Sequence, residues 1–354
     1  MASAPPIEAA VLPASRRFAV PWLALAVVFA VAAALVGVLS GPVAGFGAAD
    51  VLREFASHIP GLGVRSHLTE LESGVLWQIR MPRVALGLLV GATLAGAGSA
   101  YQGVFRNPLA DPYLLGVAAG AGLGATAVIV SGGASSSLVP VAAFAGASAA
   151  VVLTLILGRT VGSAGGLATL ILAGVTVSAF FTALQTFIQQ QHTDVVIEVY
   201  SWLLGRLSTS GWSDVAMVSP YVAISLVLIL SHRRLLDALA LGDDEAKSLG
   251  IDVRRVRMIV IAAATLGTAA VVAVSGLIGF VGIIVPHAVR LACGGGYRRT
   301  VPLSIIVGGG FLVLTDVLAR TALAPSEIPI GVVTAFFGAP FFALVLRSTR
   351  GRSR

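Results

Sequence analysis

Long apolar segments recur from residue 19 almost to the C-terminus, and this pattern restricts the possible folds more than any other feature of the sequence. About 20 consecutive apolar residues in a helix cross the hydrocarbon layer of a membrane, where the backbone must satisfy its own hydrogen bonds. Ten segments reach or approach this length: 19–40, 83–104, 113–131, 138–158, 166–189, 213–231, 256–275, 276–292, 301–322 and 329–347. The sequence therefore predicts an all-α polytopic membrane protein with about ten transmembrane helices.

The composition excludes a water-soluble globular fold. Hydrophobic residues make up 57% of the chain and charged residues only 11%, whereas soluble domains carry about 25% charged residues. No soluble fold buries that much apolar surface, so lipid is the expected solvent. In a membrane protein the net charge of +7 reports which side carries the basic residues, so we do not expect nucleic acid as a partner.

The basic residues predict the orientation. Ten crossings place both termini on one side, and cytoplasmic loops carry an excess of Lys and Arg. With a cytoplasmic N-terminus, 17 of the 23 basic residues lie inside, and the six outside are Arg53, Arg65, Arg80, Arg83, Arg206 and Arg320. We predict a multi-pass protein of the cytoplasmic (inner) membrane with both termini cytoplasmic. Its tails are 1–17 and 349–354, and its transmembrane domain is 18–348.

Local patterns refine this picture. Segment 195–207 is too short to cross the membrane and predicts a re-entrant or interfacial helix, with Tyr200 and Trp202 suited to the headgroup zone. The seventh and eighth segments run together, so the boundary between them is poorly defined. Glycines spaced by four predict close helix packing at the pairs Gly87/Gly91, Gly116/Gly120 and Gly120/Gly124.

Motifs for chemistry are missing. The chain has one lysine, Lys247, preceded by Ala246, so it has no P-loop for nucleotide phosphates. It has no G-x-S-x-G elbow and no H-x-x-x-H pair. We therefore expect no catalytic residue, metal site or cofactor. Asp316 and Arg320 lie four residues apart near an outer helix end, where they are expected to pair on one face. The chain resembles a conduit without its own energy source rather than an enzyme.

Residues 232–257 form the most structured polar segment. Asp243, Asp244 and Glu245 fit a first helical turn, where the helix dipole favours acids. Lys247 lies four residues after Asp243, which is a favourable spacing for an ion pair. Gly250 is a helix stop. The pattern predicts a short capped helix at the cytoplasmic face, serving either as an ordinary solvated loop or as a docking element for a cytoplasmic partner.

Four stretches resemble one family. They are QIRMPR at 78–83, SAYQGVFRNPLADPYLLG at 99–116, residues 242–250 together with GLIGFVGIIVPHAVR at 276–290, and TDVLARTALAPSEIPIGVVTAFFGAPF at 315–341. The chain is similar over about residues 20–348 to the FecCD-type permeases of type II ABC importers, which include cobalamin, haem and ferric-siderophore permeases. The resemblance implies a type II importer permease fold, a second permease copy, two ATPase subunits and a periplasmic or extracellular substrate-binding protein.

The resemblance also implies residue roles. Arg80, Arg83 and Arg320 match arginines that dock the binding protein, with Met81 in place of the family's leucine. Asn107 and Leu109 match a cytoplasmic gate, and Leu167 and Ala168 occupy a second gate where the family often has small hydroxyl residues. Gln185 and Gln189 could face the pathway or contact neighbouring helices. The ATPase-coupling residues fall within a segment at 237–252: Leu241, Gly242, Asp243, Asp244, Glu245, Lys247, Leu249 and Gly250.

Two other classes of function stay open on the sequence alone. A secondary transporter or channel without ATP would need ionisable groups in mid-membrane, and the apolar segments are nearly free of charge. A membrane scaffold or sensor subunit would not transport at all. The cargo is not defined by the sequence: ferric siderophore, haem and cobalamin are each compatible, and a homodimer is favoured.

Overall fold

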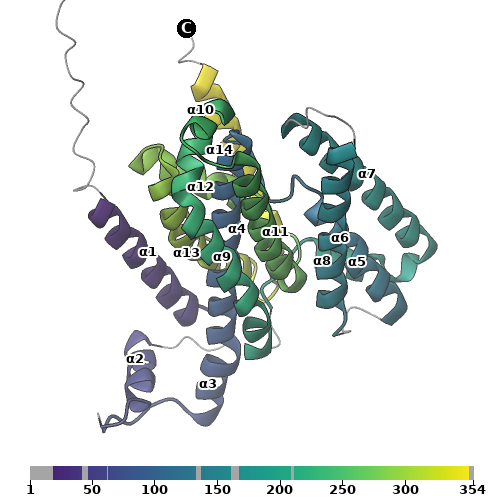
Figure 1. The fold of residues 1–354 in the computed structure, drawn as a ribbon. Helices are drawn as coiled ribbons and strands as arrows, with labels where there is room; N and C mark the ends of the chain where they lie inside the picture. The colour runs from purple at the N-terminus through teal and green to yellow at the C-terminus, as the bar shows by residue number, and fades with distance from the viewer. Residues whose placement is uncertain are drawn as a thin grey trace, which may run out of the picture.

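The computed structural model describes residues 19–41, 47–61, 63–132, 137–160, 167–208 and 211–350. Within these ranges the regular structure is entirely helical (Figure 1). The elements are α1 (Ala19–Leu39), α2 (Ala48–Ser57), α3 (Glu70–Val75), η1 (Leu76–Arg80), α4 (Met81–Phe105), α5 (Val117–Gly132), α6 (Val139–Thr160), α7 (Leu167–Gln191), η2 (Thr193–Val195), α8 (Val196–Leu203), α9 (Trp212–Leu241), α10 (Asp243–Ser248), α11 (Val253–Ser275), α12 (Val281–Cys293), α13 (Tyr297–Thr321) and α14 (Ile330–Arg350).

Ten of these helices correspond to the ten predicted segments. In the described part of the chain, seven are long and apolar enough to cross a membrane, and α5, α12 and α14 contribute three shorter apolar helices. The all-helical membrane fold is confirmed. The predicted tail at 1–17 and the last four residues of the C-terminal tail lie outside the described residues.

Two helix ends differ from the prediction. The sixth segment was expected to end at residue 231, but α9 continues to Leu241. It continues because Leu236 and Leu239 are fully buried, so the helix keeps an apolar face after its other side has become charged. The second segment was expected to begin at residue 83, yet the helical path starts at Glu70 and runs through α3 and the π-turn η1 into α4. Thr69 and Glu72 form a capping box at its start.

The boundary between the seventh and eighth segments is a five-residue break. Helix α11 ends at Ser275 and α12 begins at Val281, so the expected helix at 276–292 starts five residues late. Gly276, the residue after α11, has a φ of 67°, and Phe280, the residue before α12, has a φ of 68°. Positive φ at these two positions ends the first helix and separates it from the second. Tyr113 satisfies the broken backbone because its hydroxyl donates to the Ile278 carbonyl at 3.0 Å and accepts from the Ile278 N–H at 3.2 Å.

Segment 195–207 contains the short helix that the sequence predicts. Helix α8 has eight residues, too few to cross a membrane. Tyr200 is exposed, but Trp202 is buried in the protein core. Neighbouring helices cover the Trp202 ring, and the location of these two residues in the headgroup zone stays a prediction.

Helix α4 lies at the centre of one helical group and packs against α13, α11, α9 and α12 (Figure 1). Glycines allow this close approach. A Cβ on Gly91 would collide with the Gly308 carbonyl of α13, and a Cβ on Gly98 would collide with the backbone of Gly282 in α12. Close packing is thus confirmed at Gly91, one of the glycines that the spacing singled out.

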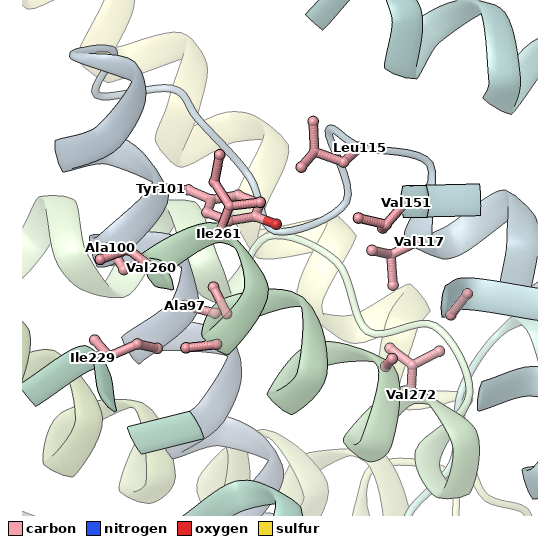
Figure 2. Close-up of a cluster of buried hydrophobic side chains, with 14 of the residues drawn as sticks. Ala97, Ala100, Tyr101, Leu115, Val117, Val151, Ile229, Val260, Ile261 and Val272 are labelled. Atoms are coloured by element: carbon pink, nitrogen blue, oxygen red, sulfur yellow. The ribbon is translucent and has the colours of Figure 1, made fainter. Parts of the chain in front are cut away.

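Helices α5, α6 and α7 pack together as a second group. Gly120 of α5 and Gly146 of α6 each face the other's carbonyl oxygen, and Gly124 faces that of Ala142. A shared core joins the two groups, and Figure 2 shows side chains from α4, α5, α6, α9 and α11 in it. The predicted close packing at Gly120 and Gly124 is confirmed.

Candidate functional site

A buried charged cluster lies at one end of α4 and α13. The Arg83 guanidinium pairs with Asp316, its Nη2 lying 2.8 Å from Oδ1, and also donates to Glu327 at 2.8 and 2.9 Å. Arg320 Nε lies 3.3 Å from the second Asp316 oxygen, so the predicted Asp316–Arg320 pair is confirmed. Two guanidiniums therefore share one carboxylate whose side chain is only 3% exposed.

Arg80 and Arg320 cap the last turn of α1. Arg80 Nη1 donates to the carbonyls of Val38 and Leu39 at 3.0 and 3.1 Å. Arg320 donates to the carbonyls of Gly37 at 2.6 Å and Ser40 at 2.9 Å. A helix C-terminus carries unpaired carbonyls and partial negative charge, which cations stabilise. Both arginines are buried, and these hydrogen bonds tie their side chains to the end of α1.

Arg83 and Glu327 reach the edge of this cluster. The Glu327 side chain is 40% exposed, and its hydrogen bonds from Arg83 hold the pKa of the carboxyl below its usual value. Both residues line a cavity of about 240 Å³ together with Arg206, Ser208 and Pro329. The structure brings Arg80, Arg83 and Arg320 to the same end of the molecule. Their role in docking a partner protein stays a prediction.

The predicted short helix lies at the opposite end. Helix α10 runs from Asp243 to Ser248, with Gly250 in the left-handed region just after it. The Ile251 N–H donates to the Ala246 carbonyl and the Gly250 N–H to that of Lys247, which is a Schellman ending. Ala246 is fully buried. Figure 1 shows α10 at the end remote from α2 and α3.

The ion pairs of α10 differ from the prediction. Lys247 pairs with Asp244 at 3.0 Å rather than with Asp243. Asp243 instead faces two arginines from elsewhere in the chain, with its Oδ1 3.0 Å from Arg257 and 3.5 Å from Arg106. The expected Asp243–Lys247 pair is wrong because these two guanidiniums occupy the Asp243 carboxylate.

The first predicted gate directly follows α4. Arg106 ends the helix in the left-handed conformation, with φ 51°. Asn107 then accepts a hydrogen bond on its Oδ1 from the Leu109 N–H at 2.9 Å, which holds the turn. At the second predicted gate, Leu167 begins α7 half-buried against the core and Ala168 is exposed. The gating roles of both positions stay predictions.

A cavity of about 960 Å³ opens along α7 beside the segment that follows the first gate. Gln185 and Gln189 are not among its lining residues. The Gln185 side chain is buried against Gly122 of α5, which favours the helix-contact alternative for it. Six polar residues line the cavity: Asp111, Tyr113, Ser178, Thr182, Thr186 and Gln190.

Sequence reasoning missed the residues that join these features. Asp237 of α9 accepts from the backbone N–H groups of Tyr297 and Arg298, and so caps α13 from another helix. Glu327, Arg106 and Asp237 lie inside stretches that the sequence had already singled out, which was the available signal. Arg257 also lies in the segment 232–257, but its pairing with Asp243, 14 residues away, follows no helical spacing that the sequence could reveal.

The described chain is a bundle of apolar helices with a buried charged cluster at one end, a short capped helix at the other and a cavity of about 960 Å³ between α7 and residues 111–114. These features are typical of a polytopic membrane subunit. The sequence matches the FecCD transport family over residues 25–348, and the chain belongs to that family. It is therefore the membrane-spanning permease subunit of an ABC importer, a class that works with ATPase and substrate-binding partners.

Individual relatives agree with the family. The ABC transporter permease YvrB of Bacillus subtilis is 42% identical over 287 residues, covering 79% of this chain and 80% of YvrB. The cobalamin import permease BtuC of Halobacterium salinarum is 40% identical, covering 79% and 75%. A structure described as an inward-facing metal-chelate type ABC transporter superposes with a TM-score of 0.78 at 30% identity, covering 92% of this chain and 98% of that one. Further relatives are named for hemin and Fe(3+) dicitrate transport.

Proposed function

We propose that this permease imports an iron-siderophore, haem or cobalamin-type complex, as a homodimer with two ATPases below it and a binding protein above it. The relatives named for cobalamin, hemin and Fe(3+) dicitrate support this class of cargo. The observation that carries the proposal is the placement of the matched residues. Arg83 and Arg320 lie at one end of α4 and α13, while Arg106 and Asp237 tie the other ends of these helices to the coupling segment 237–252.

The cavity along α7 supports a pathway for a large cargo. Its volume of about 960 Å³ lies at the upper end of the range for ligand sites. Among its lining residues only Asp111 is ionisable as an acid or base near neutral pH, so a bulky complex meets few groups that would retain it. The cavity is largely open to its surroundings, and a second permease copy facing α7 would close it.

Alternating access follows from these parts. ATP binding closes the ATPases, coupling residues 241–250 move with them, and the gate at Asn107 and Leu109 responds. Nucleotide binds the closed ATPases more tightly than the open ones, and this difference shifts the equilibrium between the inward-open and outward-open states of the permease. This chain contributes no catalytic residue, so hydrolysis belongs to the ATPase subunits. On the outer side, a carboxylate of the binding protein would compete with Glu327 for Arg83.

Replacing Asp243–Lys247 by a Gly/Ser linker is expected to abolish coupling. The permease purified from its own host should carry an ATPase whose hydrolysis it raises, and the linker variant should lose that ATPase or its stimulation. The matched control is the same replacement at 63–67, in the loop at the opposite end. Cargo uptake by vesicles without ATP, driven by a proton gradient, would instead establish a secondary transporter. An ATPase retained by the linker variant would contradict the coupling role.

The proposed orientation predicts opposite labelling of two introduced cysteines. Asp244 and Leu71 have side chains that are largely exposed, and Cys293 is the single native cysteine. In a Cys293→Ser background, a membrane-impermeant maleimide added to intact cells should label Leu71→Cys and spare Asp244→Cys. Inverted membrane vesicles should give the reverse pattern. Labelling of both positions from one side would refute the orientation and the cytoplasmic location of the termini.

A further inference from the structure

We propose that the Asp243–Arg106 ion pair is the link that carries movement of the coupling helix to the cytoplasmic gate. The proposal rests on the proposed function, because it assigns residues to a step within that transport cycle. It names Arg106, which the family resemblance did not assign, as a positioning residue for the gate.

The geometry places this pair between the two elements. Asp243 is the first residue of α10, and Arg106 is the residue immediately before Asn107. Their charged atoms, Asp243 Oδ1 and Arg106 Nη2, are 3.5 Å apart across 137 residues of sequence. The other contact of Asp243, with Arg257 at 3.0 Å, ties the same carboxylate to the start of α11. Asp243 is therefore held from both sides.

Both elements are stiff enough to pass on a displacement. Helix α10 is closed by its Schellman ending and anchored by the buried Ala246, so it moves as one piece. On the gate side, the Asn107 N–H donates to the Gln102 carbonyl, and the Asn107 side chain accepts from Leu109. Leu109 is three positions after Arg106 along the chain, so a displacement of Arg106 is passed to Leu109 through the turn that Asn107 holds.

The position of Arg106 in the left-handed region strengthens this argument. Residues other than glycine adopt this conformation at a cost, and such positions persist where the surroundings hold them. The Arg106 amide donates to the Gln102 carbonyl, and Gln102 accepts from Arg290 of α12 at 2.6 Å. Arg106, which precedes the predicted gate, is thus held by α12 through Gln102 and by the coupling helix α10 through Asp243.

An exposed ion pair contributes little to stability. The Arg106 and Asp243 side chains are 40% and 36% exposed, so removing the Arg106 charge is expected to leave the fold intact, whereas Asp243→Asn also removes the partner of Arg257, whose side chain is 17% exposed. This makes a loss of transmission separable from unfolding. The Asp50–Arg53 pair of α2 is a matched control, because its side chains are also exposed, 37% for Asp50 and 49% for Arg53, and α2 lies at the end of the molecule remote from α10 (Figure 1).

The test measures gate accessibility in the permease assembled with its ATPase in liposomes. Leu109→Cys in the Cys293→Ser background is labelled with a maleimide, with and without Mg-ATP. With the native pair, ATP is expected to change the labelling rate at least fivefold. Arg106→Gln should bring this change below twofold while ATP hydrolysis continues, and Asp243→Asn should lose the labelling response to the same extent. The double variant should be no worse than either single variant, and Arg106→Lys should retain part of the response.

Three outcomes decide the matter. The proposal is supported if the two single variants and the double variant lose the response equally, while Asp50→Asn with Arg53→Gln keeps it. It is overturned if Arg106→Gln keeps the ATP-dependent labelling, or if the effects of the two substitutions add. An absence of ATP-dependent labelling with the native pair would overturn the proposal together with the gate assignment. That result is distinguishable, because it appears before any change to the pair.

Discussion

Asp316→Asn is expected to destabilise the permease by about 3–5 kcal/mol, the cost of breaking a buried ion pair by removing one partner. Asparagine preserves the shape of the side chain but removes the negative charge that Arg83 and Arg320 share. The Arg83 and Arg320 side chains are 12% and 3% exposed, so water compensates little for the lost carboxylate. The effect should appear as a large fall in the midpoint of thermal unfolding of the detergent-solubilised protein.

Glu327→Gln is the matched control for Asp316→Asn, because it also removes a carboxylate that Arg83 contacts. The Glu327 side chain is 40% exposed, and an ion pair in that setting contributes about 0–1 kcal/mol. A small shift is therefore expected. If the two variants unfolded at the same midpoint, the assignment of Asp316 as the central charge of the cluster would be wrong.

Gly91→Val is expected to give the second large effect, the loss of a monodisperse folded permease. A Cβ at position 91 would collide with the Gly308 carbonyl and lie 2.7 Å from the Leu312 Cβ. The facing backbone of α13 has no side chain to move aside, so α4 and α13 must separate. Overpacking costs about 1–3 kcal/mol and occasionally more, and the backbone contact places this site at the upper end.

Gly74→Val tests whether valine in a helix is itself the cause of that loss. Gly74 is in α3, and a Cβ built there meets nothing within 4 Å. The control variant should elute from size-exclusion chromatography as the native protein does, while Gly91→Val should appear in the void volume or fail to accumulate. Normal elution of Gly91→Val would contradict the close contact between α4 and α13.

The apolar segments predicted the helices because hydrophobic length follows from bilayer thickness. The same criterion placed the end of α9 too early. Arg233 and Arg234 lower the hydropathy after residue 231, yet Leu236 and Leu239 continue the helical apolar face into the polar region. Hydropathy marks where a helix leaves the hydrocarbon layer. The helix itself continues as long as its side chains pack against neighbouring helices, and it ends at its capping residue.

The sequence predicted where the residues of the candidate site lie, but it did not predict which groups they contact. The location of Arg80, Arg83 and Arg320 at one end followed from topology and resemblance. The carbonyls that Arg80 and Arg320 bind belong to α1, and no side-chain pattern reports a backbone acceptor. The partners of Asp243 were missed for a similar reason: local spacing suggested Lys247, while the tertiary fold brings Arg106 and Arg257 closer.

The hydrogen bonds from Arg80 and Arg320 to the end of α1 have a consequence for biosynthesis. Ribosomes complete α1 first, but Arg320, which binds its Gly37 and Ser40 carbonyls, is made about 280 residues later. Helix α13 is also a main packing partner of α1. Helix α1 therefore acquires these contacts only when α13 has been translated, and its end stays unpaired with Arg320 while the helices between them are made.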